Sequence, residues 1–190
     1  MLIWYNIKSK ERYIFIHIPK NGGKYIRKRI NKNKQNKIII GFWGIKDNID
    51  LAHIPYIKRQ KYIKKLSKKG LYEKYNYITY SRYPYDRLIS AFFYKNKDKT
   101  IDDFKDFCNN ELININFNNE YSYKNIHYYP QYLFICNKNR ELININIKRI
   151  EDPKKYNLKK YYDNETIRKV NEIYSRDFEL LNYKKYNAII

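Results

Sequence analysis

The chain has 190 residues, a length typical of one domain, and 43% of them are hydrophobic, which is enough for one buried core. Lys and Arg number 40 against 19 Asp and Glu, so the net charge of +21 favours anionic partners and argues against neutral, apolar ones. No apolar run reaches the ~18 residues of a membrane-spanning helix, and the N-terminal residues lack the apolar region of a signal peptide. We therefore expect a soluble intracellular protein without a membrane anchor.

Cysteine and histidine usage gives no sign of a metal centre. Cys108 and Cys136 are the only cysteines, without the paired spacing of a zinc site and too few for a disulfide scaffold. We interpret both as free core thiols. The histidines and acidic residues form no known metal-binding motif, so no metal cofactor is expected. Positive charge is concentrated in residues 1–70, which hold 19 basic and 3 acidic side chains.

The first clear element of the chain is a predicted strand that runs into a turn and a helix. Residues 12–18 (RYIFIHI) form an apolar, β-rich run that ends at Pro19. This pattern predicts a strand buried on both faces, and we expect it to be the first strand of a parallel sheet. Residues 21–23 (NGG) then predict a turn, and residues 24–30 have the composition of a helix.

The same order of elements recurs further along the chain. Residues 76–81 (NYITYS) predict a strand, and residues 84–94 predict a helix with Pro84 in its first turn and apolar residues at helical spacing. The other predicted elements are a strand at 37–40, a basic helix at 55–69 closed by Gly70, a helix at 100–108 capped by Thr100, a strand at 143–150 and a helix at 164–178.

The hexapeptide ELININ occurs twice, at 111–116 and 141–146. The residues between the copies do not match each other, and a solenoid needs about three or more units. In a chain this rich in Ile and Asn we interpret the two copies as a coincidence and reject a repeat fold.

The turn at 19–23 has the features of an anion-binding loop. The start of a helix presents unpaired backbone N–H groups that favour an anion, Lys20 adds positive charge, and Gly22 and Gly23 allow close approach of the backbone. The Walker phosphate-binding loop is a poor match, because Ile18 stands where its first glycine belongs and Tyr25 where its metal-binding hydroxyl belongs. An ordinary ATPase or GTPase loop is therefore disfavoured.

The residues of this turn resemble a known family. The segment 17–25 (HIPKNGGKY) resembles the sulfotransferase signature HIPKTGGTS, and residues 79–94 (TYSRYPYDRLISAFFY) resemble the family's second motif, R-x-P-x-x-R-x-x-S. Residues 52–56 (AHIPY) resemble the segment GH-x-P-Y of the heparan-sulfate 2-O-sulfotransferase-like branch. Segments at 127–131, 149–152 and 174–183 are similar in order and spacing to later family segments, so the resemblance covers nearly the whole chain.

The resemblance implies a fold, an activity and a site. The fold would be a P-loop-like α/β three-layer sandwich, one domain over residues 1–190, with a central, mostly parallel sheet flanked by helices. The activity would be metal-independent transfer of a sulfuryl group from 3′-phosphoadenosine 5′-phosphosulfate, which leaves 3′-phosphoadenosine 5′-phosphate, to a hydroxyl of a carbohydrate, an anionic or neutral polysaccharide. Arg82 and Ser90 would hold the 3′-phosphate, and His53 would be the catalytic base. The residues that would surround the 5′-phosphosulfate are Pro19, Lys20, Asn21, Gly22, Gly23, Lys24 and Tyr25.

Three residues, in two segments, depart from the family pattern. Lys24-Tyr25 replaces Thr-Ser after the glycines, and Ala52 replaces the glycine before the histidine. Either the charge of Lys24 substitutes for the lost hydroxyl contacts, or their loss weakens donor binding.

The chemistry of sulfuryl transfer requires a base, a cation for the leaving phosphate, and a donor held in line with the acceptor. His53 suits the base because an unperturbed imidazole has a pKa of about 6.5, and Lys20 suits the cation. Arg82 offers a planar fork for phosphate oxygens. His17, inside an apolar strand, is better explained as structural, and His127 as a structural residue or a substrate contact. A structural ion pair of Arg87 with Asp86 or another acid, and a surface role for Ser90, stay open.

Two other functions compete with this interpretation. A P-loop-like nucleotide kinase would bind ATP with magnesium, and Tyr25 argues against it. A basic nucleic-acid-binding protein without catalysis would show steeply salt-dependent binding, but nucleic acid is the less favoured partner. If the sulfotransferase interpretation holds, we expect the basic helix that includes residues 58–69 to guide an anionic polysaccharide.

Overall fold

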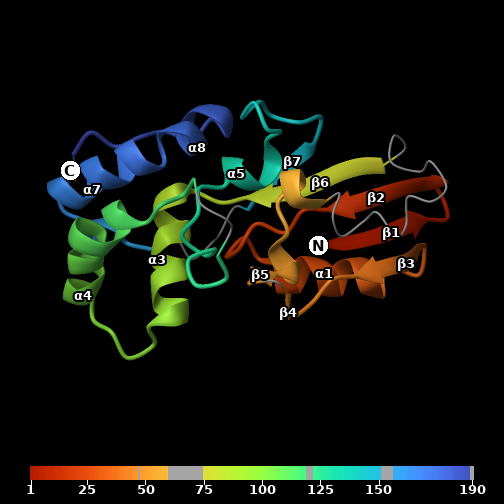
Figure 1. The fold of residues 1–190 in the computed structure, drawn as a ribbon, viewed down its shortest axis with the longest axis horizontal. Coiled ribbons are helices and arrows are strands. Elements are labelled where there is room, and N and C mark those ends of the chain that lie inside the picture. The colour runs from red at the N-terminus through yellow and green to blue at the C-terminus, as the bar shows by residue number, and fades with distance from the viewer. Residues whose placement is uncertain (47, 60–74, 119–121, 151–155, 189–190) are drawn as a thin grey trace.

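A five-stranded sheet forms the centre of the computed structural model, which describes residues 1–46, 48–59, 75–118, 122–150 and 156–188 (Figure 1). The strand order is β3-β1-β2-β6-β7. The strands are β1 (Leu2–Asn6), β2 (Glu11–Phe15), β3 (Asn36–Gly41), β6 (Tyr75–Ser81) and β7 (Asn146–Arg149). β2, β6 and β7 are parallel, whereas β1 is antiparallel to both of its neighbours, β2 and β3. Within the described sheet β1 therefore runs against the other four strands, and the fold is mixed α/β with a mostly parallel sheet.

The strand predicted at 12–18 corresponds to β2, which ends at Phe15. We expected it to be the first strand of the sheet, but it is the second. β1 precedes it and pairs with it as a hairpin in which Leu2 lies opposite Phe15 and Asn6 opposite Glu11. Trp4 stacks on Tyr13 across this pair, with ring centroids 5.2 Å apart. The backbone of β1 pairs with β2 and β3, and its apolar side chains pack on both faces of the sheet, Leu2 and Trp4 on one and Ile3 on the other. The five-residue run alone does not reveal these partners.

At β1 and β2 both faces of the sheet are covered, as the apolar run of β2 predicts, whereas β3 and β7 are largely exposed. On one face helix α1 (Gly23–Lys32) packs Ile26 against Leu2, Trp4 and Phe15. On the other face Ile14 belongs to a second cluster, in which side chains from α5 (Tyr132–Ile135) and from the irregular segments at 54–57 and 126–129 cover the sheet. The alternation of Ile14 and Phe15 between the two clusters is the two-residue period of a strand.

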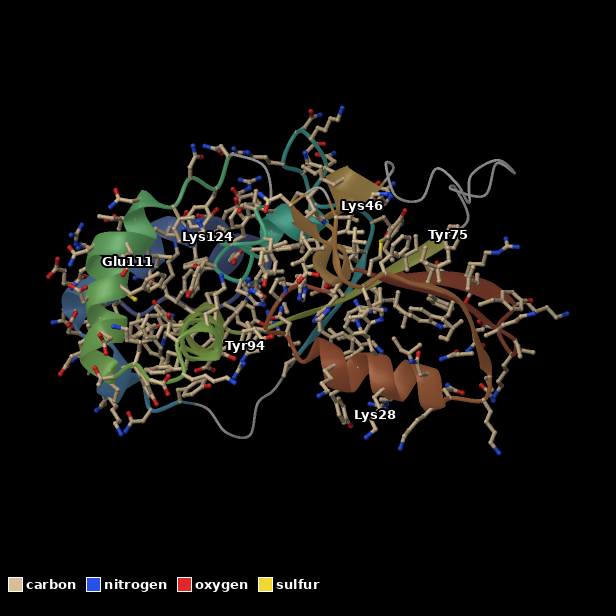
Figure 2. All side chains as sticks on the ribbon, turned by 60° about the horizontal axis from the view of Figure 1, so that its bottom comes forward. Lys28, Lys46, Tyr75, Tyr94, Glu111 and Lys124 are labelled. Atoms are coloured by element: carbon tan, nitrogen blue, oxygen red, sulfur yellow. The ribbon has the colours of Figure 1, made fainter. Side chains whose placement is uncertain are left out.

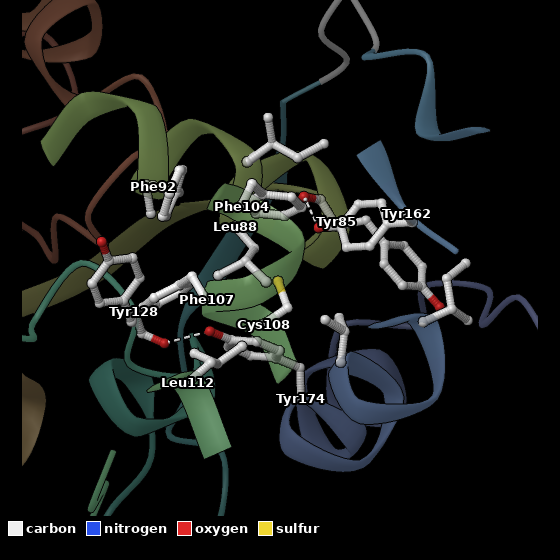
Figure 3. Close-up of a cluster of buried hydrophobic side chains, with 14 of the residues drawn as sticks. Tyr85, Leu88, Phe92, Phe104, Phe107, Cys108, Leu112, Tyr128, Tyr162 and Tyr174 are labelled. Carbon is white, nitrogen blue, oxygen red and sulfur yellow. Dashed lines mark hydrogen bonds between the residues drawn. The ribbon is translucent and has the colours of Figure 1, made fainter. Parts of the chain in front are cut away.

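A group of helices forms a third cluster beside the sheet, on the left in Figure 1. Its helices are α3 (Pro84–Lys95), α4 (Ile101–Asp106), α6 (Leu158–Tyr161), α7 (Asn164–Ile173) and α8 (Ser175–Leu180). Figure 3 shows the packed side chains, among them two buried tyrosines that bond to backbone. The Tyr162 hydroxyl donates to the carbonyl of Tyr85 at 2.9 Å, and the Tyr174 hydroxyl donates to that of Tyr128 at 2.6 Å. These bonds satisfy hydroxyl groups that would otherwise be costly to bury.

Most predicted elements are confirmed, including the strands at 37–40 and 76–81 and the helices at 24–30, 84–94 and 100–108. The strand predicted at 143–150 is present only over Asn146–Arg149. The helix predicted over 164–178 is wrong as one element, because it breaks at Tyr174 into α7 and α8. The basic helix predicted at 55–69 begins instead with a short 3-10 turn, η2 (Tyr56–Lys58), and the part from residue 60 on lies outside the described residues. Both cysteines are buried and free, as expected.

The two ELININ segments adopt different structures, which confirms that they are not a structural repeat. The first lies in the π-helical turn η5 (Phe107–Glu111) and the 3-10 turn η6 (Leu112–Asn114) that extend α4, and the second leads in extended form into β7. Over the residues that the structure describes, no helix is both long and apolar enough to cross a membrane.

Candidate active site

Three parallel strands end together at one edge of the sheet. β2 is followed by the turn at 19–23 and α1, and its parallel neighbour β6 is followed by Arg82 and α3. Ile150 follows β7 at the same edge. Its N–H donates to the carbonyl of Ser81 at 2.8 Å, next to the end of β6. Its Cδ1 lies 3.3 Å from the position that a Cβ of Gly22 would take, next to the end of β2. The carboxyl ends of parallel strands are where open α/β sheets bind ligands, so this edge is the candidate site.

In the turn at 19–23, backbone groups and not a capping side chain lie at the N-terminus of α1. Lys20 and Gly22 both have φ of 66°, the left-handed region, and Gly22 caps α1 without a side-chain hydrogen bond. The first turn of α1 carries no acidic residue. At Gly23 a Cβ would stand 1.6 Å from Nε2 of His17, so only glycine leaves room for that ring. The helix start is thus open to an anion.

Gln131 connects the loops after β2 and β6. Its side-chain oxygen accepts hydrogen bonds from Asn21 Nδ2 at 2.8 Å and from the Arg82 N–H at 3.0 Å, and its Nε2 donates to the Arg82 carbonyl at 2.8 Å. Asn21 Nδ2 also donates to the carbonyl of Tyr80 at 2.6 Å. The fully buried Asp177 accepts from the Gln131 N–H at 2.7 Å, and burial raises the pKa of its carboxyl to about 6. This network fixes the two loops relative to each other.

Three cationic side chains gather around the turn. Lys20 Nζ lies 3.8 Å from the centre of the Tyr94 ring, and Arg82 Nη1 donates to the Lys20 carbonyl at 3.4 Å. The buried Arg87 donates to the carbonyl of Pro19 at 3.0 Å and to that of His127 at 3.1 Å, so it ties the turn to α3. Burial, with the charges of Arg82 and Arg87, lowers the pKa of Lys20 to about 8. Concentrated positive charge of this kind attracts an anion.

The remaining residues predicted to bind the donor take different positions. Ser90 is half-buried on α3. It lies three residues after Arg87 and four residues before Tyr94, so the three side chains share the face of α3 that meets the turn at 19–23. Lys24 and Tyr25 are exposed in the first turn of α1, with Tyr25 69% exposed. They therefore lie at the rim of the site rather than in the Gln131 network.

His53 lies at the end of the 3-10 turn η1 (Leu51–His53) that follows the short strands β4 (Ile45–Lys46) and β5 (Ile49–Asp50). Its ring is 4.1 Å from that of His17 and 5.6 Å from that of His127, centre to centre. His53 Nδ1 is 3.0 Å from the carbonyl oxygen of His17, which can only accept, so Nδ1 carries the hydrogen and Nε2 the lone pair. Nε2 faces Asp50 Oδ2 at 3.7 Å. Burial lowers the pKa of His53 to about 3, so its imidazole is neutral at pH 7.

Arg27 is a residue of this region that the sequence analysis missed. Although it is a cation, it lies on the buried face of α1 with Ile26. It donates to the carbonyl of Ala52 at 3.0 Å, lies 3.5 Å from His17 Nδ1 and stacks on Trp43 at 4.2 Å. Arg27 thereby ties the turn that carries His53 to α1, the helix that begins after the turn at 19–23. The one sign of this role in the sequence was a charged residue at a position of the predicted helix that the pattern assigns to the buried face.

The structure thus brings Lys20, Arg82 and His53 to one edge of the sheet from three separate segments. Comparison of the chain with protein-family models, with curated proteins and with solved structures finds no match.

Proposed function

We propose that the protein is a P-loop-like sulfotransferase that transfers a sulfuryl group from 3′-phosphoadenosine 5′-phosphosulfate to a hydroxyl of a carbohydrate. The observation that carries the proposal is the meeting of Lys20 and Arg82 at the open start of α1, where β2 and β6 end. The pattern of residues that resembles the sulfotransferase signatures supplies the identity of the anion.

The residues present fit a donor with phosphate at both ends. Backbone N–H groups at the start of α1 and the ammonium of Lys20 suit the 5′-phosphosulfate, and the guanidinium of Arg82 with the hydroxyl of Ser90 suits the 3′-phosphate. The exposed Lys24 adds a cation at the rim where the signature has a hydroxyl residue. A net charge of +21 favours an anionic polysaccharide as acceptor.

Each group has a chemical task that its environment supports. The bound donor supplies an activated sulfuryl group. Lys20 remains mostly protonated at pH 7 with a pKa of about 8, so its ammonium can neutralise the charge that develops on the leaving phosphate oxygen. The resemblance assigns proton removal to His53, which is neutral at pH 7 and has Asp50 beside it to stabilise the imidazolium.

Calorimetric titration with 3′-phosphoadenosine 5′-phosphate tests the donor site. We expect micromolar binding by the wild-type protein, weaker binding of adenosine 5′-monophosphate, and a loss of about 10- to 100-fold in affinity in Arg82→Ala, since a hydrogen bond to a charged group contributes about 1.5–3 kcal/mol. Arg168→Ala is the matched control, because Arg168 is exposed on α7 and pairs with Glu172.

The competing functions give different results in the same titration. Preferential binding of ATP with magnesium would replace the proposal by a nucleotide kinase. Binding to DNA or RNA that weakens steeply with salt, without preference for the 3′-phosphate, would favour a nucleic-acid-binding protein. Equal affinities of Arg82→Ala and Arg168→Ala for the nucleotide would remove Arg82 from the site.

A further inference from the structure

Trp43 is an exposed aromatic residue next to the segment that carries His53. It lies between β3 and β4, and 62% of its surface is exposed, although a tryptophan gains much from burial. The chain has one other tryptophan, Trp4, which is only 5% exposed. Burial in the core therefore does not account for the position in which the indole of Trp43 is held.

Contacts on the protein side hold Trp43 in place. The guanidinium of Arg27, itself buried, lies over the indole at 4.2 Å from the ring centre and covers it from one side. The carbonyl of Gly44, the next residue in the chain, accepts a hydrogen bond from the N–H of Leu51 at 2.8 Å. A ring that is held from one side and open to solvent is pre-organised for stacking, because a ligand does not have to order it.

The same contacts connect Trp43 to His53. Arg27 Nη2 donates to the carbonyl of Ala52, the residue before His53, at 3.0 Å. The same nitrogen lies 3.5 Å from Nδ1 of His17, whose ring is 4.1 Å from that of His53 between centres. A single side chain, that of Arg27, therefore links the exposed indole to the turn that carries the proposed base.

The helix surface around Arg27 is cationic. Lys24 lies three residues before Arg27 and four before Lys28, which is the spacing of neighbours on a helix surface. Both lysines are exposed, and α1 contains no acidic residue. Figure 2 shows Lys28 on this helix and Tyr94 near the start of the helix. A ligand that stacks on Trp43 would thus have an aromatic face on one side and positive charge on the adjoining helix.

An acidic sugar fits this combination of groups. A pyranose ring has a face of C–H groups that can pack on an indole, and a carboxylate or sulfate substituent is attracted by lysines. A nucleobase could stack on the same ring. The sugar is favoured because the proposed function requires a carbohydrate at His53, and Trp43 is linked to that residue.

We propose that Trp43 is the stacking platform for an acidic sugar of the acceptor chain. The inference rests on the proposed function, which places the reacting hydroxyl at His53. Because Arg27 separates Trp43 from the turn of His53, the stacked sugar is a neighbour of the reacting sugar and not the reacting sugar itself. Trp43 binds and orients the chain and takes no part in proton transfer.

Tryptophan fluorescence tests this inference without any turnover. The probes are hexasaccharides of hyaluronan, which carries carboxylates, of heparin, which carries sulfates, and of chitin, which is neutral. Since only Trp43 is exposed, we expect an acidic hexasaccharide to shift the emission to shorter wavelength and to protect it from quenching by acrylamide. The response should persist in Trp4→Phe, the matched control, and disappear in Trp43→Phe.

Calorimetric titration of the same probes measures what the ring contributes. We expect Trp43→Leu, which keeps an apolar side chain without an aromatic face, to weaken binding of the acidic hexasaccharide by about 2- to 10-fold. Trp43→Phe should recover most of that affinity, which a purely structural role of the indole would not require. Both variants should bind 3′-phosphoadenosine 5′-phosphate within about twofold of wild type.

The outcomes separate this inference from the proposed function. Equal affinities of Trp43→Leu and wild type for the acidic hexasaccharides would overturn the inference, as would equally tight binding of the neutral one. Tighter binding of a single-stranded oligonucleotide with the same change in emission would replace the sugar by a nucleobase. A wild-type protein that binds the nucleotide but neither acidic hexasaccharide would also overturn it. Binding of the hexasaccharide at Trp43 without nucleotide binding would instead count against the proposed function alone.

Discussion

At Gly23 two effects of a methyl group oppose each other, and their sizes decide the outcome. Gly23 begins α1, where alanine is the better helix former by up to about 1 kcal/mol. Its Cβ, however, would stand 1.6 Å from Nε2 of His17, a ring that is itself buried. Overpacking a filled core costs about 1–3 kcal/mol or more, so the steric effect wins.

We therefore expect Gly23→Ala to lower the free energy of unfolding by about 1–3 kcal/mol in urea denaturation, and to weaken nucleotide binding because the turn moves. Gly41→Ala is the control, since its nearest heavy atom would be 3.6 Å away, an ordinary contact. If His17 is the obstacle, His17→Ala in the Gly23→Ala background recovers part of the loss. Equal stabilities of the two alanine variants would contradict the close packing of His17 on Gly23.

At the scale of elements, α4 shows a local signal that specifies where a helix begins. Thr100 accepts a hydrogen bond from the N–H of Asp103 at 3.2 Å, and Asp103 accepts one from the N–H of Thr100 at 2.7 Å. This reciprocal pair satisfies backbone groups that the helix start leaves without partners. The bonds to Thr100 hold the pKa of Asp103 down at about 2.

Loss of this cap should cost about 1 kcal/mol, so we expect Thr100→Ala to unfold at lower urea concentration than the wild-type protein. Thr100→Ser keeps the hydroxyl and should remain within about 0.5 kcal/mol of wild type. A Thr100→Ser loss as large as that of Thr100→Ala would show that the methyl group, not the cap, is what α4 needs.

Elements that depend on local patterns were predictable, and those that depend on distant partners were not. The turn and helix after β2, and the cap at Thr100, follow from neighbouring residues, and the structure contains them. β1 was missed because its strand character comes from its place between β2 and β3. The break between α7 and α8 occurs at Tyr174, whose hydroxyl reaches the carbonyl of Tyr128 across the core, a contact that spacing within 164–178 does not contain.

The residues of the candidate site also divide into those that local patterns predict and those that depend on distant partners. Lys20 and Arg82 were identified from motifs, because each motif is a short strand, turn and helix. Gln131 contacts Asn21 from 110 positions away in the sequence, so its bridging role exists only in the folded chain. Arg27 was missed for the same reason, since its partner carbonyl belongs to Ala52 on a separate turn.

At the scale of the whole molecule, the three buried histidines make stability depend on pH. Burial lowers the pKa values of His53 and His127 to about 3 and that of His17 well below its usual value. An unfolded histidine titrates at about 6.5, so below that pH the unfolded chain binds protons that the folded protein does not. The contribution of these rings is complete above pH 6.5 and falls as the pH decreases towards 3.

Each histidine in this window changes the free energy of unfolding by about 1.4 kcal/mol per pH unit. Asp177, with its pKa raised to about 6, acts in the opposite direction, because its contribution is lost as the pH rises through 6. One carboxyl is outweighed by three imidazoles, so we expect stability in urea denaturation to fall steeply between pH 6.5 and 5. His127→Gln removes one of these titrating groups, so the free energy of unfolding should fall with pH by about 1.4 kcal/mol per pH unit less than in the wild-type protein. A free energy of unfolding that stays constant from pH 8 to 5 would contradict the neutral, buried state of the rings.

The bond network at Gln131 has a consequence for how quickly a ligand is captured. Because one amide oxygen receives both Asn21 and Arg82, the loops after β2 and β6 are held together before anything binds. A rigid anion site has no slow closing step, so the rate of association is governed by diffusion and by the long-range attraction between opposite charges. That attraction is screened by salt. Stopped-flow capture of the nucleotide should therefore slow as ionic strength rises, with a single kinetic phase throughout.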